Sequence, residues 1–273
     1  MYKRQPADRE LGRALVDRPD DITGPQVHLV YVLPSDGTDR ALDVDGSIAR
    51  SITLVQDWLS RESGGQRLRL DTFAGRPDIT FVRLPKTDAR IASSGAFVRE
   101  MVDRGLLDGG HVEPDTMYLA YYDGSSTFAC GGATYPPVII GQVVAVYLRG
   151  RPAPFIDCNA NVVGAVGATQ PAYFDIAMLH EFVHGLGLAS TCAPHQHSLG
   201  HVDDAANDLM WTGNAPWDVE HVQLDVNRDD YFGHGRTDCR DLRHSAFLTP
   251  SIEPTWMPPG WGGTPRSLLP MFD

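Results

Sequence analysis

The chain has 273 residues, 42% of them hydrophobic and 21% charged, so it is long enough to bury a substantial core. Asp and Glu number 35 against 23 Lys and Arg, which gives a formal net charge of −12. An acidic protein repels nucleic-acid phosphates and anionic membrane surfaces, so both are excluded as partners. No apolar stretch reaches the roughly 20 residues of a membrane-spanning helix.

The first elements in chain order predict an α/β arrangement. Residues 27–33, VHLVYVL, are continuously apolar, as in a strand buried on both faces. A helix follows, with Ile48, Ile52 and Val55 at helical spacing, and it ends at Gly64. Further strands are predicted at 68–72, 79–84, 117–122 and 143–148, and further helices at 89–107 and 173–186. Strands that alternate with helices favour a mostly parallel sheet.

The composition changes after Gly187, where His, Asp, Pro and Gly replace the periodic apolar pattern. We therefore divide the chain into an N-terminal extension (1–24), an α/β lobe (25–187) and an irregular lobe (188–273). The last of these ends in a tail rich in Pro, Gly and Trp, from about residue 250 to 265. The predicted fold class is α/β or α+β, with a mixed sheet and helices in the first lobe, and we expect a monomer.

The four cysteines, Cys130, Cys158, Cys192 and Cys239, are even in number, and none forms a CxxC pair. This favours two disulfides and an oxidising compartment over four buried free thiols. The start of the chain has no apolar run of the signal-peptide type, so in a secreted protein a signal peptide is expected to have been removed.

The strongest functional signal is the sequence His180-Glu181-Phe182-Val183-His184, an H-E-x-x-H motif expected by chance about once in a hundred such chains. On a helix, the two histidines project from one face and can share a zinc ion, which needs a third ligand and an open position for water. Glu181 is then placed to act as general base on that water. The alternative is an exposed histidine pair on an amphipathic helix.

A resemblance to a protease family rests on two segments. Residues 180–187, HEFVHGLG, resemble the start of the metzincin signature H-E-x-x-H-x-x-G-x-x-H, and residues 208–211, DLMW, resemble the Met-turn of that clan. The resemblance implies a two-lobed zinc endopeptidase, typically secreted, with the cleft between its lobes and Met210 beneath the metal. It also implies a protein or peptide substrate.

The third ligand departs from the signature, because position 190 holds Ser190 where the metzincin pattern has histidine. We infer an insertion over about residues 188–200 that postpones the ligand. In matrix-type metzincins the methionine follows the third histidine by about eight residues. His201 precedes Met210 by nine residues, whereas His197 and His195 precede it by 13 and 15. We therefore assign His201 as the third ligand.

Alternatives to this assignment stay open. In another zinc-protease clan a glutamate from a later helix is the third ligand, and Glu220 and Glu253 are the downstream glutamates here. Asp203 and Asp204 are close enough in sequence to orient a ligating imidazole or to replace it.

Weaker signals follow the motif. Asp225, Asn227 and Asp229 match the D-x-N-x-D start of a calcium loop, but the sixth position lacks Gly and the twelfth lacks Glu, so Ca²⁺ is only a possible cofactor. The alternative is that these residues cap local backbone. Tyr231, His234 and His195 are candidates for the cleft, where the first two would polarise a substrate carbonyl.

The cysteine pairing expected from the two lobes is Cys130–Cys158 and Cys192–Cys239, since either other pairing would tie the lobes together. The sequence thus predicts a secreted zinc endopeptidase. The alternative is a zinc-bound but catalytically silent binding or structural module, for which Glu181 would have no chemical purpose.

Overall fold

The computed structural model describes residues 12–111, 113–134, 142–151, 157–160 and 162–258. Its centre is a five-stranded mixed sheet in the order β5-β1-β6-β8-β7, in which β7 alone runs antiparallel to its neighbour β8. The five strands are β1 (Gln26–Leu33), β5 (Ile79–Arg83), β6 (Thr116–Ser125), β7 (Gly131–Gly132) and β8 (Val143–Arg149). The predicted α+β class and the mostly parallel sheet are confirmed.

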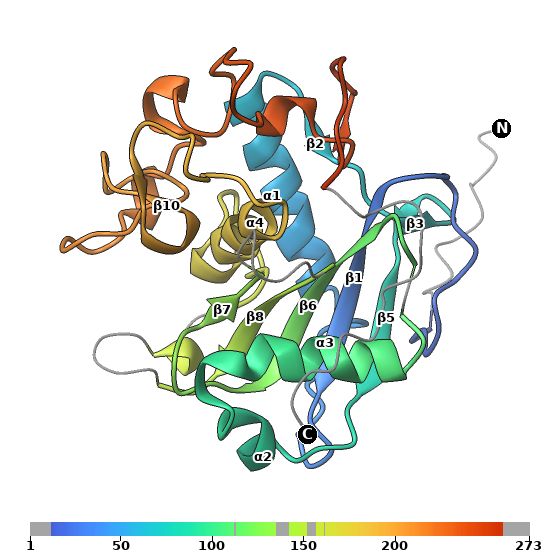
Figure 1. Ribbon diagram of the computed structural model, residues 1–273. Helices are drawn as coiled ribbons and strands as arrows, with labels where there is room; N and C mark the ends of the chain where they lie inside the picture. Colours follow the sequence, from blue (N-terminus) through green and yellow to red (C-terminus); the bar gives the residue numbers. More distant parts are fainter. Residues whose placement is uncertain (1–11, 112, 135–141, 152–156, 161, 259–273) are drawn as a thin grey trace, which may run out of the picture.

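Helices cover both faces of this sheet, as Figure 1 shows. On one face lie α1 (Ser47–Ser63) and α4 (Tyr173–Gly185), whose apolar side chains share a core with the odd-numbered residues of β1. On the other face lie α2 (Asp88–Ala92) and α3 (Val98–Asp108), which cover a smaller core. The strands are apolar on both sides because both faces are covered, which explains the continuous apolar run of β1.

Two predicted elements are interrupted. The helix expected at 89–107 is split into α2, a 3₁₀ turn at Gly95–Phe97 and α3. The hydroxyl groups of Ser93 and Ser94 donate to the carbonyls of Arg90 and Ile91 and so compete with helix continuation. The strand expected at 68–72 is divided between β2 (Arg67–Leu68) and β3 (Thr72–Phe73), and between them Leu70 forms only an isolated bridge with Val27.

The chain after α4 consists of short elements. Strands β9 (Gln196–His197) and β10 (His201–Val202) form a small hairpin, and β11 (Leu248–Thr249) pairs with β2. The same part of the chain contains 3₁₀ turns at Ser198–Gly200, Val219–His221, Val226–Arg228 and Leu242–His244. Before α4, the remaining short elements are the pair β3 (Thr72–Phe73) and β4 (Arg76–Pro77) and a 3₁₀ turn at Cys158–Ala160. Buried side chains on both sides of residue 187 belong to one core, and the division into lobes stays a prediction.

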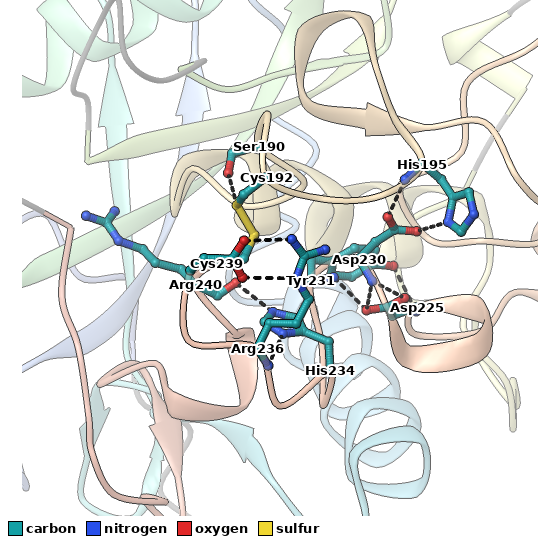
Figure 2. Close-up of a disulfide and its surroundings, with 11 residues drawn as sticks. Ser190, Cys192, His195, Asp225, Asp230, Tyr231, His234, Arg236, Cys239 and Arg240 are labelled. Atoms are coloured by element: carbon teal, nitrogen blue, oxygen red, sulfur yellow. Dashed lines mark hydrogen bonds and ion pairs between the residues drawn. A yellow bond between two sulfur atoms is a disulfide. The ribbon is translucent and has the colours of Figure 1, made fainter.

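Both predicted disulfides are confirmed. Cys130 pairs with Cys158 at a Cα–Cα distance of 5.6 Å, and Cys192 pairs with Cys239 at 5.5 Å (Figure 2). Two disulfides indicate an oxidising compartment. No helix in the described part of the chain has the length and apolar character needed to cross a membrane. Residues 1–11 of the predicted extension and the tail beyond residue 258 lie outside the described residues.

Candidate metal centre

Three imidazoles meet between α4 and the hairpin that follows it. His180 and His184 lie one turn apart on α4, and His201 begins β10. The Nε2 atom of His184 is 3.0 Å from that of His180 and 3.2 Å from that of His201. We call these three residues the histidine cluster. Their nitrogens form one of three groups in the described residues that have the geometry to hold a metal ion.

The tautomers of the His180 and His201 rings follow from the hydrogen-bond partners of their Nδ1 atoms. The Nδ1 atom of His180 is 2.6 Å from the carbonyl oxygen of Leu209, and that of His201 is 3.0 Å from the carbonyl oxygen of Ser198. A carbonyl only accepts hydrogen bonds, so each Nδ1 carries the proton. Each Nε2 therefore presents a lone pair to the centre of the cluster, which is the arrangement of a metal-binding histidine with its orienting partner.

Burial keeps these imidazoles uncharged. Burial and, to a smaller extent, the neighbouring His201 lower the pKa of His180 to about 3. Burial also lowers the pKa of His184 well below its usual range and lowers that of His201. Neutral imidazole is the form that binds metal, so the cluster needs no deprotonation at neutral pH.

The donor set fits a single zinc ion. Two ligand nitrogens of a tetrahedral zinc ion lie about 3.3 Å apart, close to the two separations in the cluster. The Nε2 lone pairs of His180 and His201 face the Nε2 atom of His184, so a cation placed between the three rings would be within reach of all three nitrogens. Glu220 and Glu253, the alternative third ligands, are both exposed and lie outside the cluster.

His201 reaches the cluster through the loop after α4. Gly187, with φ +74°, turns the chain away from the helix, and Cys192 anchors the loop to Cys239. Leu199 and Gly200 then adopt left-handed conformations immediately before the ligand, with φ of +60° and +77°. Glycine adopts such a conformation without strain, so the chain can bend into the site at that point.

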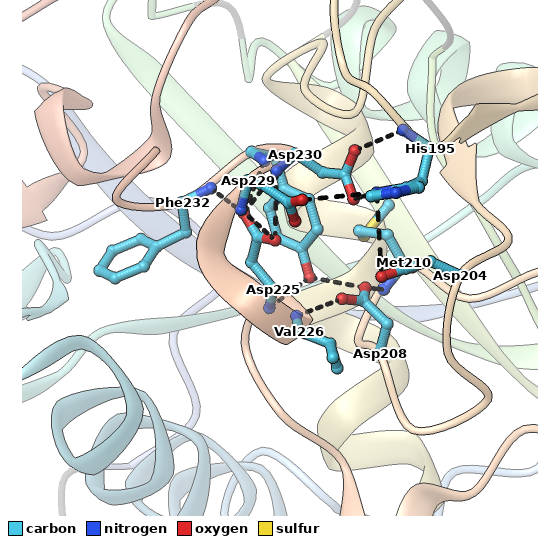
Figure 3. A network of polar contacts seen from close by, with 10 residues as sticks. His195, Asp204, Asp208, Met210, Asp225, Val226, Asp229, Asp230 and Phe232 are labelled. Atoms are coloured by element: carbon cyan, nitrogen blue, oxygen red, sulfur yellow. Dashed lines mark hydrogen bonds and ion pairs between the residues drawn. The ribbon is translucent and has the colours of Figure 1, made fainter. Parts of the chain in front are cut away.

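The turn at residues 208–211 lies directly against the cluster, because the carbonyl of Leu209 accepts the His180 proton. Its neighbour Met210 is fully buried. Asp208 organises this turn: its carboxylate accepts from the backbone N–H of Met210 at 2.7 Å and of Val226 at 2.7 Å, and from the Tyr231 hydroxyl at 2.8 Å (Figure 3). The turn is thus fixed by a buried carboxylate.

Glu181 follows His180 on α4, and its side chain is 9% exposed. Burial raises the pKa of Glu181 to about 8. Among the described residues it has no hydrogen-bond partner. A cation held by the adjacent histidines would stabilise the carboxylate, so metal binding and the availability of a base are coupled here.

The other two candidate histidines lie apart from the cluster. His197 is exposed on β9. His195 accompanies Asp204, Asp229 and Asp230 in a second group, which we call the polar cluster. There the Asp230 carboxylate accepts from the backbone N–H of His195 at 2.8 Å and pairs with its Nδ1 at 3.1 Å (Figures 2 and 3). Asp204 therefore faces His195 rather than His201, whose orienting partner is the Ser198 carbonyl.

Two residues expected in the cleft have other roles. Tyr231 is fully buried, and its hydroxyl donates to Asp208 and accepts from the backbone of Asp225, so the prediction that it polarises a substrate is wrong. His234 uses both ring nitrogens within its own loop, with the backbone N–H of Arg236 at 3.0 Å and the carbonyl of Arg240 at 3.2 Å. The position of His195 at a cleft stays a prediction.

Asp225 must be corrected from a calcium ligand to a backbone cap. Its carboxylate accepts from the backbone N–H groups of Asp229, Asp230, Tyr231 and Phe232. These donors occupy both carboxylate oxygens of Asp225, which fits the alternative prediction that residues of this segment cap local backbone.

Sequence patterns missed several neighbours of the site. The Trp217 ring lies 5.5 Å from that of His180, and its Nε1 donates to the carbonyl of Asp208. No spacing rule links a lone tryptophan to a distant helix.

The third group with the geometry to hold a metal ion lies on the N-terminal side and consists of Asp17, His28, Asp71 and Asp78. These residues pair with one another and with Arg18.

Comparisons with protein-family models and with curated proteins found no match. Among solved structures, a chaperone–substrate complex is similar with a TM-score of 0.28 and 14% identity, over 61% of this chain and 24% of that chain. Catalytically inactive OgpA from Akkermansia muciniphila, in complex with an O-glycopeptide substrate, is similar with a TM-score of 0.34 and 12% identity. That match covers 66% of this chain and 52% of OgpA. The chain thus spans about a quarter and about half of these two proteins, and the low scores carry no argument about function.

Proposed function

We propose that the protein is a secreted, zinc-dependent endopeptidase. The observation that carries the proposal is the convergence of three Nε2 atoms, with those of His180 and His201 at 3.0 and 3.2 Å from that of His184, on and against the helix that also carries Glu181. The resemblance of residues 180–187 and 208–211 to the metzincin signature and Met-turn supports the same reaction. The two disulfides support the secreted location.

His180, His184 and His201 would hold the metal. Zinc bound there would supply Lewis-acid chemistry: it would polarise the scissile carbonyl and make a water molecule more acidic. The carbonyl of Leu209 holds the His180 ring in its ligating tautomer, and the carbonyl of Ser198 does the same for His201.

Glu181 would move the proton. Its carboxylate takes a proton from the attacking water as the oxygen of that water adds to the carbonyl carbon. The same carboxyl group then gives the proton to the amide nitrogen, so that the C–N bond breaks and a carboxylic acid and an amine are released.

The test is hydrolysis of casein by the zinc-loaded full chain, followed by removal of the metal with a chelator and its return. We expect activity that the chelator abolishes and zinc restores. Glu181→Gln should lower kcat by about 10²–10⁴-fold with one zinc per chain retained. Glu220→Gln, a matched change at an exposed glutamate, should leave kcat unchanged.

Near-full turnover by Glu181→Gln would contradict the proposed base. A parent that binds zinc and cleaves neither casein nor a peptide library would favour the silent zinc-bound module instead.

A further inference from the structure

The edge strand β7 lies beside α4 (Figure 1). Its first residue, Gly131, faces the Glu181 side chain. A Cβ atom placed on Gly131 would be 2.4 Å from Oε1 of Glu181, 3.0 Å from its Cδ and 3.1 Å from its Cγ. Glu181 therefore occupies the space that any side chain at position 131 would take.

Backbone conformation does not explain this glycine. Gly131 lies outside the left-handed region, and it pairs regularly with Val146 in the antiparallel ladder. An L-residue could adopt the same backbone angles without strain. What requires glycine at this position is the carboxyl group against it.

The backbone of Gly131 cannot easily retreat from Glu181. The preceding residue, Cys130, accepts the backbone N–H of Tyr147 at 2.8 Å and is bonded to Cys158. Gly132 continues the pairing with Ala145 on β8. The backbone of β7 is thus held on both sides of Gly131, whereas the carboxyl group of Glu181 is the free end of a flexible side chain.

Glu181 has no hydrogen bond to hold it among the described residues. The position of its carboxyl group therefore depends on contact with Gly131. We propose, on the basis of the function proposed above, that Gly131 is a positioning residue: its missing side chain sets where the Glu181 carboxylate stands relative to the histidine cluster.

Alanine at position 131 would displace the carboxylate by about 1 Å, because an ordinary contact to a Cβ atom begins near 3.4 Å. A misplacement of that size in a catalytic group costs about 100-fold in rate. The loss should fall on kcat, with KM nearly unchanged, because Gly131 acts through the base. Zinc content should also be unchanged, since the three atoms nearest to a Cβ at position 131 all belong to Glu181 and none to an imidazole.

The experiment compares Gly131→Ala with Gly12→Ala in the full, zinc-loaded chain. A Cβ atom placed on Gly12 would meet no other atom within 4 Å, and its backbone has no left-handed angle, so it is a matched control for a Gly→Ala change. Gly131→Ala should lose about 100-fold in kcat, and Gly12→Ala should lose less than about 2-fold. In a Glu181→Gln background, Gly131→Ala should add almost nothing, because the two changes then affect the same step.

A second measurement does not depend on turnover. The chain has seven glutamates, so their carboxyl carbons give few signals in a carbon-13 spectrum, and Glu181→Gln identifies the signal of Glu181. Gly131→Ala should move that signal and leave the other glutamate signals in place, while Gly12→Ala should move none of them.

These readouts separate the two proposals. If the parent is inactive but the Glu181 signal moves, the endopeptidase proposal fails and the contact between Gly131 and Glu181 stands. If the parent is active and Gly131→Ala keeps full kcat or leaves the signal unmoved, the positioning proposal is overturned and the proposed function survives.

Discussion

The histidine cluster and the polar cluster use the same side-chain chemistry in opposite ways. In the histidine cluster burial lowers the pKa of each imidazole, and the group of possible ligands contains no carboxylate. In the polar cluster the Asp230 carboxylate raises the pKa of His195 by hydrogen bonding to its ring. The histidine cluster therefore favours neutral imidazoles, whereas the polar cluster favours the protonated, positively charged form of His195.

This difference shows how to tell a metal site from an ion-pair network when both contain histidine. The decisive feature is where the second nitrogen of each ring points. His180 and His201 donate hydrogen bonds from Nδ1 to backbone carbonyls, so the lone pair of each Nε2 faces the centre of the cluster. His195 instead directs its Nδ1 to a carboxylate. The first arrangement presents lone pairs to a cation, whereas in the second the imidazole itself pairs with a carboxylate.

The largest expected effect is on zinc affinity. His201→Ala should weaken zinc binding by more than about 100-fold, because loss of even an outer orienting partner costs about 10–100-fold. His195→Ala and His197→Ala should keep affinity within about 3-fold. Competition with a chromophoric chelator measures this. If His195→Ala strips the metal and His201→Ala does not, the assignment of the two clusters is reversed.

The stability of the metal-free protein should depend on pH in opposite senses through the two clusters. The histidines of the histidine cluster protonate near pH 6.5 when unfolded but only near pH 3 for folded His180, so stability falls as pH drops below 6.5. His195 has a raised pKa when folded, so its contribution is present below pH 6.5 and is lost as pH rises through its folded pKa.

Urea unfolding of the metal-free chain at pH 7 and pH 5 measures this dependence. Each group whose pKa differs between the two states contributes up to about 1.4 kcal/mol per pH unit. His184→Asn should flatten the pH dependence and His195→Asn should steepen it. Equal slopes in both variants would mean that the two clusters do not differ electrostatically.

A smaller effect is expected from Asp208, the buried carboxylate that serves the histidine cluster. Asp208→Asn replaces one acceptor oxygen with an NH₂ group, so one of the N–H donors from Met210 or Val226 loses its partner. The cost should be about 1–3 kcal/mol in unfolding free energy. Asp218→Asn, at an exposed carboxylate that pairs with His221, should change stability by less than about 0.5 kcal/mol. Similar values for both variants would refute the role given to Asp208.

The smallest effect should come from Tyr231→Phe. The change removes one hydrogen bond to Asp208 and one from the backbone of Asp225, for about 1 kcal/mol, while the ring stays packed. Zinc affinity and kcat should not change, and the unchanged kcat would distinguish this supporting residue from one that polarises the substrate. A loss of kcat without a loss of stability would restore Tyr231 to a catalytic role.

The sequence predicted those parts of the site that depend on local periodicity. The i, i+4 spacing of His180 and His184 places both rings on one face of a helix, and the apolar runs of β1, β6 and β8 follow from burial on both sides. Helix breaks near Ser93 and Ser94 were missed because side-chain hydrogen bonds to nearby carbonyls compete with a pattern that otherwise fits a helix.

The supporting contacts were beyond sequence reasoning for a different reason. Trp217, Asp208 and Gly131 act through tertiary neighbours, and no spacing in the chain encodes such contacts. Tyr231 was misplaced because a polar aromatic near a motif fits a cleft and a buried hydrogen-bond network equally well. Its environment depends on where Asp208 and Asp225 fold.

The disulfide between Cys192 and Cys239 encloses His201, the turn at Met210 and Tyr231 within one covalent loop. Closing a loop with a sequence separation of 47 removes about 4 kcal/mol of chain entropy from the unfolded state. The bridge thus favours the folded chain, in which the third imidazole lies beside the other two, over the unfolded chain. Under the proposed function, zinc binding and thiol oxidation would then be thermodynamically linked: the bridge would favour the form that binds zinc, and bound zinc would in turn make the bridge harder to reduce.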